Sequence, residues 1–247
     1  MILTIARKEF RSLLATPSTW FILGALQFIF AWFFLVRLDA FLQVQAQLAQ
    51  LLNAPGVTQA VASPLLASVA FILMMLVPVF TMRLVAEERR NQTLMLLMAA
   101  PVADHEIIIG KFLGLLLFLS LIIIACLIML LTLALGTALD FGLVFSNTLG
   151  LFLLTASYTA LGLYFSTLTT QPIVAATSTL AALFGLWLLD VSGSTAGMAL
   201  KALSPTVHFQ SFNAGLLLGK DTVYFLLFIA ACLLLAIRRL HNTRIYG

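Results

Sequence analysis

The sequence predicts an all-α integral membrane protein with six transmembrane helices and both termini in the cytoplasm. Of the 247 residues, 62% are hydrophobic and only 9% are charged, and apolar runs long enough to cross a bilayer recur along the chain. Soluble domains carry about 25% charged residues, so 13 basic and 9 acidic side chains are too few to solvate the surface of this chain. Composition therefore excludes a soluble enzyme, a disordered regulator and a disulfide-stabilised scaffold.

The six predicted spans follow from apolar length. A helix needs about 20 mostly apolar residues to cross the hydrocarbon core, and the stretches that meet or nearly meet this length are 20–36, 65–84, 112–135, 149–168, 173–189 and 222–237. The first is interpreted as a span and not as a secretory signal, because its apolar run is too long and no small-residue cleavage site follows it. Only residues 169–172 separate the fourth and fifth spans, which predicts a tight helical hairpin.

The distribution of Lys and Arg sets the orientation. An even number of crossings puts both termini on one side, and three basic residues lie on the other side: Arg37, Lys201 and Lys220. The ten basic residues on the side of the termini are Arg7, Lys8, Arg11, Arg83, Arg89, Arg90, Lys111, Arg238, Arg239 and Arg244. Because Lys and Arg accumulate on the cytoplasmic face, both termini are predicted to be cytoplasmic. The basic pI thus reflects topology, and no nucleic-acid partner is expected.

Residues 1–16 are predicted to form an amphipathic helix on the inner membrane surface. On a helical wheel, Arg7, Lys8 and Arg11 share one face, and Phe10 lies on the opposite, apolar face. Glu9 falls in the middle of the apolar face, where a carboxylate is costly unless it finds a cation. Either Glu9 extends to the lipid headgroups, or it pairs with a basic residue at the inner rim, with Arg83 as the first candidate.

Residues 86–104 form the one long charged connection on the predicted cytoplasmic side. Four consecutive charged residues and Thr93 precede an apolar stripe at i, i+3 and i+4, which lies on one helical face, and Pro101 ends this helix. The residues concerned are Glu87, Glu88, Arg89, Arg90, Thr93, Leu94, Leu97, Met98 and Pro101. A short cytoplasmic helix with an apolar stripe either lies on lipid or inserts into a groove of another protein.

The spans themselves offer little chemistry. They carry no ionisable residue near their centres, as an ion-coupled transporter usually requires, and the three histidines are divided between the two sides of the membrane. No catalytic, cofactor or metal site is therefore expected. Hydroxyl residues cluster in the fourth and fifth spans, where close helix packing is favoured over a polar stripe that lines a substrate pathway; the candidates are Thr155, Ser157, Thr159, Thr177 and Ser178.

Two segments are predicted on the outer side. Residues 37–63 carry four glutamines in an otherwise apolar run, which indicates an amphipathic surface helix. Residues 190–221 follow the fifth span and contain glycine-serine turn sequences.

Three motifs in order resemble those of the permease subunit of a type-2 ABC exporter, in the GldF-like group that is sometimes joined with NosY. They are residues 6–12, residues 87–111 and residues 203–225, and with the six spans they cover nearly the whole chain. The sequence departs from the family pattern twice, because Gln92 stands where the family usually has glycine and Met95 where it has an acidic residue.

The resemblance implies a single transmembrane permease domain over residues 1–247 in the bacterial cytoplasmic (inner) membrane. Residues 7–11 would belong to a connecting helix, and Glu87 to Pro101 to a coupling helix in a groove of a separate ATPase subunit, which binds ATP and magnesium. A second permease subunit, identical or not, would complete the pathway, with an auxiliary extracytoplasmic subunit as a further partner. Residues 190–221 would form re-entrant or surface helices.

The resemblance leaves one alternative open. The chain could be a membrane scaffold that anchors an ATPase or an extracytoplasmic complex, in motility or metalloenzyme maturation, without bulk transport.

Overall fold

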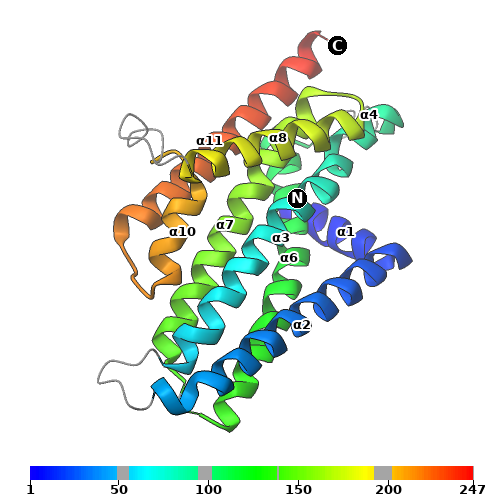
Figure 1. Cartoon of the computed structure of the whole chain (residues 1–247). Helices are drawn as coiled ribbons and strands as arrows, with labels where there is room; N and C mark the ends of the chain where they lie inside the picture. The colour runs from blue at the N-terminus through cyan, green and yellow to red at the C-terminus, as the bar shows by residue number, and fades with distance from the viewer. Residues whose placement is uncertain (49–55, 94–101, 138, 192–201, 247) are drawn as a thin grey trace.

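The computed structural model describes residues 1–48, 56–93, 102–137, 139–191 and 202–246 (Figure 1). Within these residues the secondary structure is helical throughout, and six of the helices are long and apolar enough to cross a membrane. This confirms the predicted fold class. The predicted cytoplasmic charges of α1, α4, the start of α6 and the end of α11 gather at one end of the bundle, which we call the inner end.

Each of the six predicted apolar segments is helical. Two of them, 65–84 and 112–135, extend from a helix into the short turn that follows it. The helices and turns, in chain order, are α1 (Ile2–Ala15), α2 (Pro17–Leu48), the π-helical turn η1 (Thr58–Ala62), α3 (Ser63–Met82), the π-helical turn η2 (Arg83–Glu87), α4 (Glu88–Arg90), α6 (Asp104–Leu131), the 3-10 turn η3 (Thr132–Leu135), α7 (Phe141–Leu168), α8 (Pro172–Val191), α10 (Pro205–Asn213) and α11 (Gly219–Tyr246).

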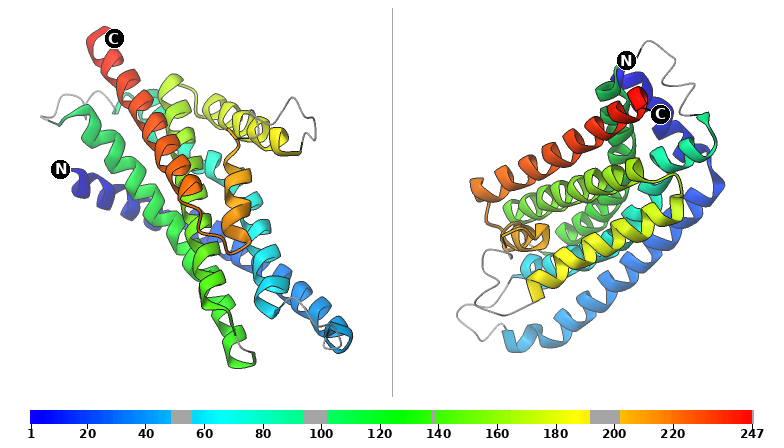
Figure 2. Two further views of the ribbon diagram at one scale, coloured as in Figure 1. Left: turned by 90° about the vertical axis from the view of Figure 1, so that its left-hand side faces the viewer. Right: turned by 90° about the horizontal axis from the view of Figure 1, so that it is seen from above.

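Helix α7 lies at the centre of the bundle and packs against α3, α6, α8, α10 and α11 (Figure 2). Asp140 caps its start, because its Oδ1 accepts hydrogen bonds from the backbone N–H groups of Gly142 at 3.0 Å and Leu143 at 3.2 Å. Two glycines permit close helix approaches: a Cβ at Gly162 would overlap Thr81 of α3, and one at Gly150 would overlap Phe212 of α10.

Helix α2 differs from the expected short span followed by a separate surface helix. It continues without a break through Arg37 to Leu48, 32 residues in all, which corresponds to about 48 Å at 1.5 Å per residue. The physical reason is that no glycine or proline occurs between Gly24 and Pro55, and glutamine is a good helix former. Its outer face carries exposed apolar side chains such as Phe21, which is suited to lipid or to a second subunit.

The segment after α8 returns into the bundle as α10. Pro205 occupies the first turn of this helix, and the helix ends before Gly215, whose φ of +84° reverses the chain. Phe209 and Phe212 are buried against the bundle, so α10 packs as an internal element beside α7 and α8 and is not a freely exposed surface helix.

Candidate functional site

A buried cluster of charges joins three elements at the inner end. Lys111 of α6 is fully buried, and its Nζ lies 3.0 Å from Oε1 of Glu9 in α1 and 2.7 Å from Oε1 of Glu88 in α4. Lys8 completes the cluster, with its Nζ 3.2 Å from Oε1 of Glu9 and 3.6 Å from Oε1 of Glu88. The four formal charges therefore cancel, and a single ammonium group links α1, α4 and α6.

Two glycines of α6 position this cluster. Gly110 and Gly114 lie one turn apart on the face that meets α1, and a Cβ at Gly114 would lie 2.7 Å from Cβ of Glu9 and 2.9 Å from the carbonyl oxygen of Ala6. A Cβ at Gly110 would lie 2.8 Å from Cβ of Ile5. Any larger residue would hold α1 away, so the small-xxx-small spacing brings Glu9 within reach of Lys111.

Burial and ion pairing shift the pKa values of this cluster in opposite directions. Burial alone would raise the pKa of the Glu9 carboxyl, but the ammonium groups of Lys111 and Lys8 outweigh it and lower this pKa below its ordinary value. For Lys8, burial would lower the pKa, but the carboxylates of Glu9 and Glu88 raise it. Oε2 of Glu88 is buried and accepts no hydrogen bond from the described residues. Glu88 thus depends on its Oε1 contacts to offset desolvation.

The sequence prediction for Glu9 was correct in requiring a cation and wrong in naming Arg83. Arg83 is exposed, and the cation that contacts Glu9 from another element is Lys111. The reason is that α1 crosses α6 at its glycines, which the helical wheel of residues 1–16 does not reveal. The Gly110–Gly114 spacing beside Lys111 is the signal that could have identified this partner.

The other residues of the predicted connecting helix lie on two faces, one exposed and one packed against the bundle, as the amphipathic pattern predicts. Arg7, Lys8 and Arg11 are exposed, whereas Phe10 is half-buried and packs against the core. The N-terminal ammonium group of Met1 lies 3.6 Å from Oε1 of Glu106 in the first turn of α6. Helix α1 is therefore attached to α6 along much of its length.

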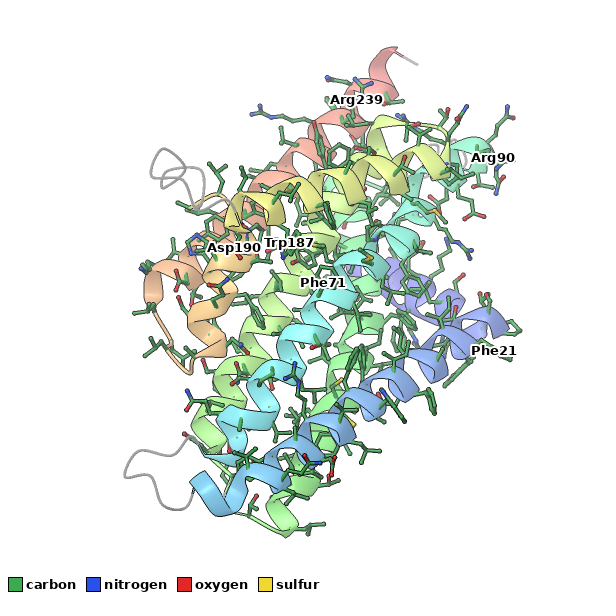
Figure 3. All side chains as sticks on the ribbon, in the orientation of Figure 1. Phe21, Phe71, Arg90, Trp187, Asp190 and Arg239 are labelled. Carbon is green, nitrogen blue, oxygen red and sulfur yellow. The ribbon has the colours of Figure 1, made fainter. Side chains whose placement is uncertain are left out.

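Among the predicted coupling residues, Glu87, Glu88, Arg89, Arg90 and Thr93 are described, and the others lie outside the described residues: Leu94, Leu97, Met98 and Pro101. Arg89 is half-buried and ties together two helices, because it donates hydrogen bonds to the carbonyl oxygen of Thr167 at 3.1 Å and to the hydroxyl of Thr243 in α11. Arg90 is exposed at the same end as Arg239 (Figure 3).

An open cleft of about 580 Å³ lies beside this segment. Arg89, Arg90 and Gln92 line it from one side, and the α7–α8 turn, residues 170–173, from the other. Gln92 has a φ of +59°, in the left-handed region that favours glycine. This positive φ lies in the turn that ends α4.

Ser166 was not identified from the sequence. Its buried Oγ accepts hydrogen bonds from the backbone N–H groups of Val85 at 3.2 Å and Ala86 at 3.0 Å, inside the π-helical turn η2. The Ser166 hydroxyl thus contacts two successive backbone N–H groups of a π-helical turn, a kind of turn that is rare in proteins. This contact fixes the end of α7 to the segment that leads to Glu88.

The hydroxyl residues proposed for a pathway bond mainly to their own helices. Thr155, Ser157 and Thr159 are buried in α7 and donate to backbone carbonyl oxygens four residues earlier, at 2.7 to 3.0 Å. Thr177 and Ser178 of α8 do the same, at 3.1 and 2.7 Å, nearer the surface. A role in lining a pathway stays a prediction for all five.

Within the described residues, no group of three or more His, Cys, Asp or Glu side chains is arranged to hold a metal ion. The cluster around Lys111 instead links the N-terminal helix and the start of α6 to Glu88, at the start of the predicted coupling segment.

Comparison with known proteins agrees with this architecture. A search of curated proteins found no significant match. The family model of the ABC-2 family transporter proteins matches residues 3–242. Because this match covers nearly the entire chain, the protein belongs to the ABC-2 family and is a multi-pass ABC transporter permease.

Proposed function

We propose that this chain is the membrane-spanning permease subunit of an ATP-driven exporter. Two permease subunits, identical or not, form the pathway, and separate ATPase subunits that bind ATP and magnesium act on the inner end. The observation that carries this proposal is the buried linkage of Glu9 and Lys111 to Glu88, which lies at the start of the predicted coupling segment.

The linkage supports a route by which a partner could move the spans. A displacement of residues 94–101 would reach Glu88 first and, through Lys111, α6 and α1. Removing one partner from a buried ion pair costs about 3–5 kcal/mol, so these elements should move together and not slide past one another. Arg89 extends the connection to α7 and α11.

The cleft beside α4 supports the position of the ATPase. It is open, carries the side chains of Arg89 and Arg90, and is bordered by the α7–α8 turn at the inner end. An acidic or polar loop of the ATPase would be complementary to this surface. The order of the three sequence motifs supports a further part of the proposal, that the chain is a GldF-like permease of the bacterial inner membrane.

The proposal is tested by charging the predicted docking face. Leu94→Asp and Leu97→Asp should leave membrane insertion intact but release the ATPase, because a carboxylate in an apolar groove is strongly unfavourable. Co-purification of the ATPase with each variant, followed by ATP turnover, measures this effect. The matched control is Leu135→Asp, since Leu135 is 92% exposed and lies at the far end of α6. ATPase recovery equal to wild type with both inner variants would contradict the assignment.

A further inference from the structure

A small cavity lies among α3, α7, α8 and α10, away from the inner-end cluster. Phe71, Tyr158, Trp187, Asp190, Thr206 and Gln210 contribute to its lining. Figure 3 shows Trp187 and Asp190 on the last turns of α8, with Phe71 on the neighbouring helix α3. Asp190 is 18 residues beyond Pro172, so about 27 Å of helix separates the cavity from the inner α7–α8 turn. The cavity therefore lies toward the outer end of α8.

Aromatic rings form one side of this cavity. The centroid of the Trp187 ring lies 5.8 Å from that of Phe71 and 5.2 Å from that of Phe184. Tyr158 of α7 is only 2% exposed, yet it lines the cavity, and its hydroxyl forms no hydrogen bond with any described residue. The faces of such rings carry negative potential, which attracts cations, with tryptophan the strongest.

Asp190 supplies a formal negative charge to the same cavity. Its Oδ2 accepts a hydrogen bond of 2.9 Å from Nε2 of Gln210 in α10. No basic side chain in the described part of the chain forms an ion pair with it. Asp190 is half-buried, so its carboxylate is available as a counter-ion for a cation in the cavity. The cavity thus combines aromatic rings with a carboxylate that Gln210 holds in place and that pairs with no basic side chain of the described residues.

The volume limits what can enter. About 140 Å³ corresponds to four or five water molecules at about 30 Å³ each, well below the roughly 300 Å³ at which sites for drug-sized ligands begin. A substituted ammonium group fits this space, whereas a whole amphiphile does not, and its apolar part would remain in the surrounding lipid.

We propose that this cavity binds the ammonium headgroup of a cationic or zwitterionic amphiphile, with Asp190 as its counter-ion and Trp187 and Phe71 as its aromatic wall. Gln210 positions the carboxylate, and Tyr158 contributes to the lining from α7. The proposed site extends the proposed function. Only the conclusion that the bound amphiphile is a substrate rests on the exporter function, because binding itself requires no ATPase.

The test uses Trp187 as its own reporter. The chain has three tryptophans, so Trp20→Phe with Trp32→Phe leaves Trp187 as the single fluorophore in the full-length protein. Choline is titrated against neohexyl alcohol, its uncharged carbon isostere, and lysophosphatidylcholine is the third probe. We expect a saturable change in Trp187 emission with the ammonium compounds and none with the isostere. Saturation by the lysolipid, with or without choline, supports an amphiphile headgroup, whereas saturation by choline but not by the lysolipid would contradict the amphiphile and indicate a site for small organic cations.

Substitutions then test whether the Asp190 carboxylate is the counter-ion of the bound ammonium group. Asp190→Asn should weaken binding about tenfold, because the ion pair is lost while the shape is kept. The matched control is Asp39→Asn: Asp39 is exposed on α2 and accepts a hydrogen bond of 2.9 Å from Gln43, as Asp190 does from Gln210. This control should bind as the parent protein does.

Equal responses to choline and neohexyl alcohol, or unchanged affinity in a folded Asp190→Asn protein, would overturn the site. The isostere comparison needs no change at Asp190, so it decides the question even if that variant does not fold. Failure of the ATPase to assemble while choline still saturates Trp187 would remove the proposed exporter function and leave the site intact. An assembled, active complex in which neither choline nor lysophosphatidylcholine changes Trp187 emission would remove the site and leave the exporter function intact.

Discussion

Lys111 shows how one side chain can hold several helices together inside a membrane protein. Its ammonium group is buried and contacts carboxylates from two other elements, Glu9 and Glu88. A charge in this position is favourable only while both partners stay in place. The same dependence makes it a sensitive point for a test of the linkage.

We predict that Lys111→Met lowers the free energy of unfolding by about 3–5 kcal/mol, because two carboxylates remain buried without their main cation. Lys8→Met is the control: the Lys8 side chain is 63% exposed, and exposed pairs contribute at most about 1 kcal/mol. Thermal unfolding in detergent compares the two. Equal midpoints for Lys111→Met and wild type would show that the cluster does not stabilise the inner end.

At the residue scale, the sequence indicated which side chain requires an interaction partner more reliably than it identified the partner. The position of Glu9 on an apolar face left two possibilities, extension to the lipid headgroups or pairing with a cation, because an isolated buried carboxylate is too costly. Which cation it would be depends on the angle and closeness at which α1 crosses α6, and thus on atoms far apart in the chain. The same applies to Ser166, whose role follows from a π-helical turn 80 residues earlier.

At the element scale, the packing of α1 onto α6 depends on the absence of side chains at Gly110 and Gly114. Helices in a membrane gain little from burial of apolar surface against each other, since lipid is equally apolar, and close backbone approach is one of the main alternatives. Glycine at i and i+4 offers that approach on one face. The glycine positions are therefore as important for the inner end as the charges are.

Gly114→Val should detach α1 from α6, because the new Cβ would meet Cβ of Glu9 at 2.7 Å and the carbonyl oxygen of Ala6 at 2.9 Å. Gly185→Val is the matched control in α8, where a Cβ would meet nothing within 4 Å. Ala6 is 2% exposed, so a cysteine placed at this position reports docking through its reactivity with a maleimide. We expect strong labelling only with Gly114→Val; protection in both variants would contradict the close approach.

Helix α2 shows that hydropathy alone does not predict where a helix ends. Its polar outer half was interpreted as a separate surface helix because hydropathy changes after Arg37, but the backbone has no reason to break there. Helix continuity depends on glycine, proline and local propensity, whereas membrane crossing depends on hydropathy. The two criteria give different boundaries when a span continues beyond the bilayer.

At the scale of the whole molecule, basic residues gather at the end of the bundle that carries α4 and the C-terminal part of α11 (Figure 3). The excess of Lys and Arg predicts that this end faces the cytoplasm. The proposed exporter depends on this orientation, since ATP is available only there.

Single-cysteine labelling checks the orientation. In cells that lack the ATPase, which would otherwise cover this position, Arg90→Cys should resist a membrane-impermeant maleimide applied to intact cells and react after the membrane is opened, because Arg90 is exposed at the inner end. Leu135→Cys, 92% exposed at the opposite end of α6, should react from outside without permeabilisation. The reversed labelling pattern would place the predicted coupling segment outside the cell and exclude an ATPase partner there.

The amino-acid sequence alone determined the membrane environment, the six spans and the predicted orientation, because apolar length and charge distribution are local properties that lipid selects directly. Tertiary structure alone decided that α7 lies at the centre, that Lys111 is the partner of Glu9, and that Asp190 shares a cavity with Trp187 and Phe71. Whether a segment crosses the bilayer depends on the hydropathy and charge of that segment alone, whereas these contacts depend on how closely the backbones approach one another. That approach is set by a few small residues, whose effect appears only when the helices are packed.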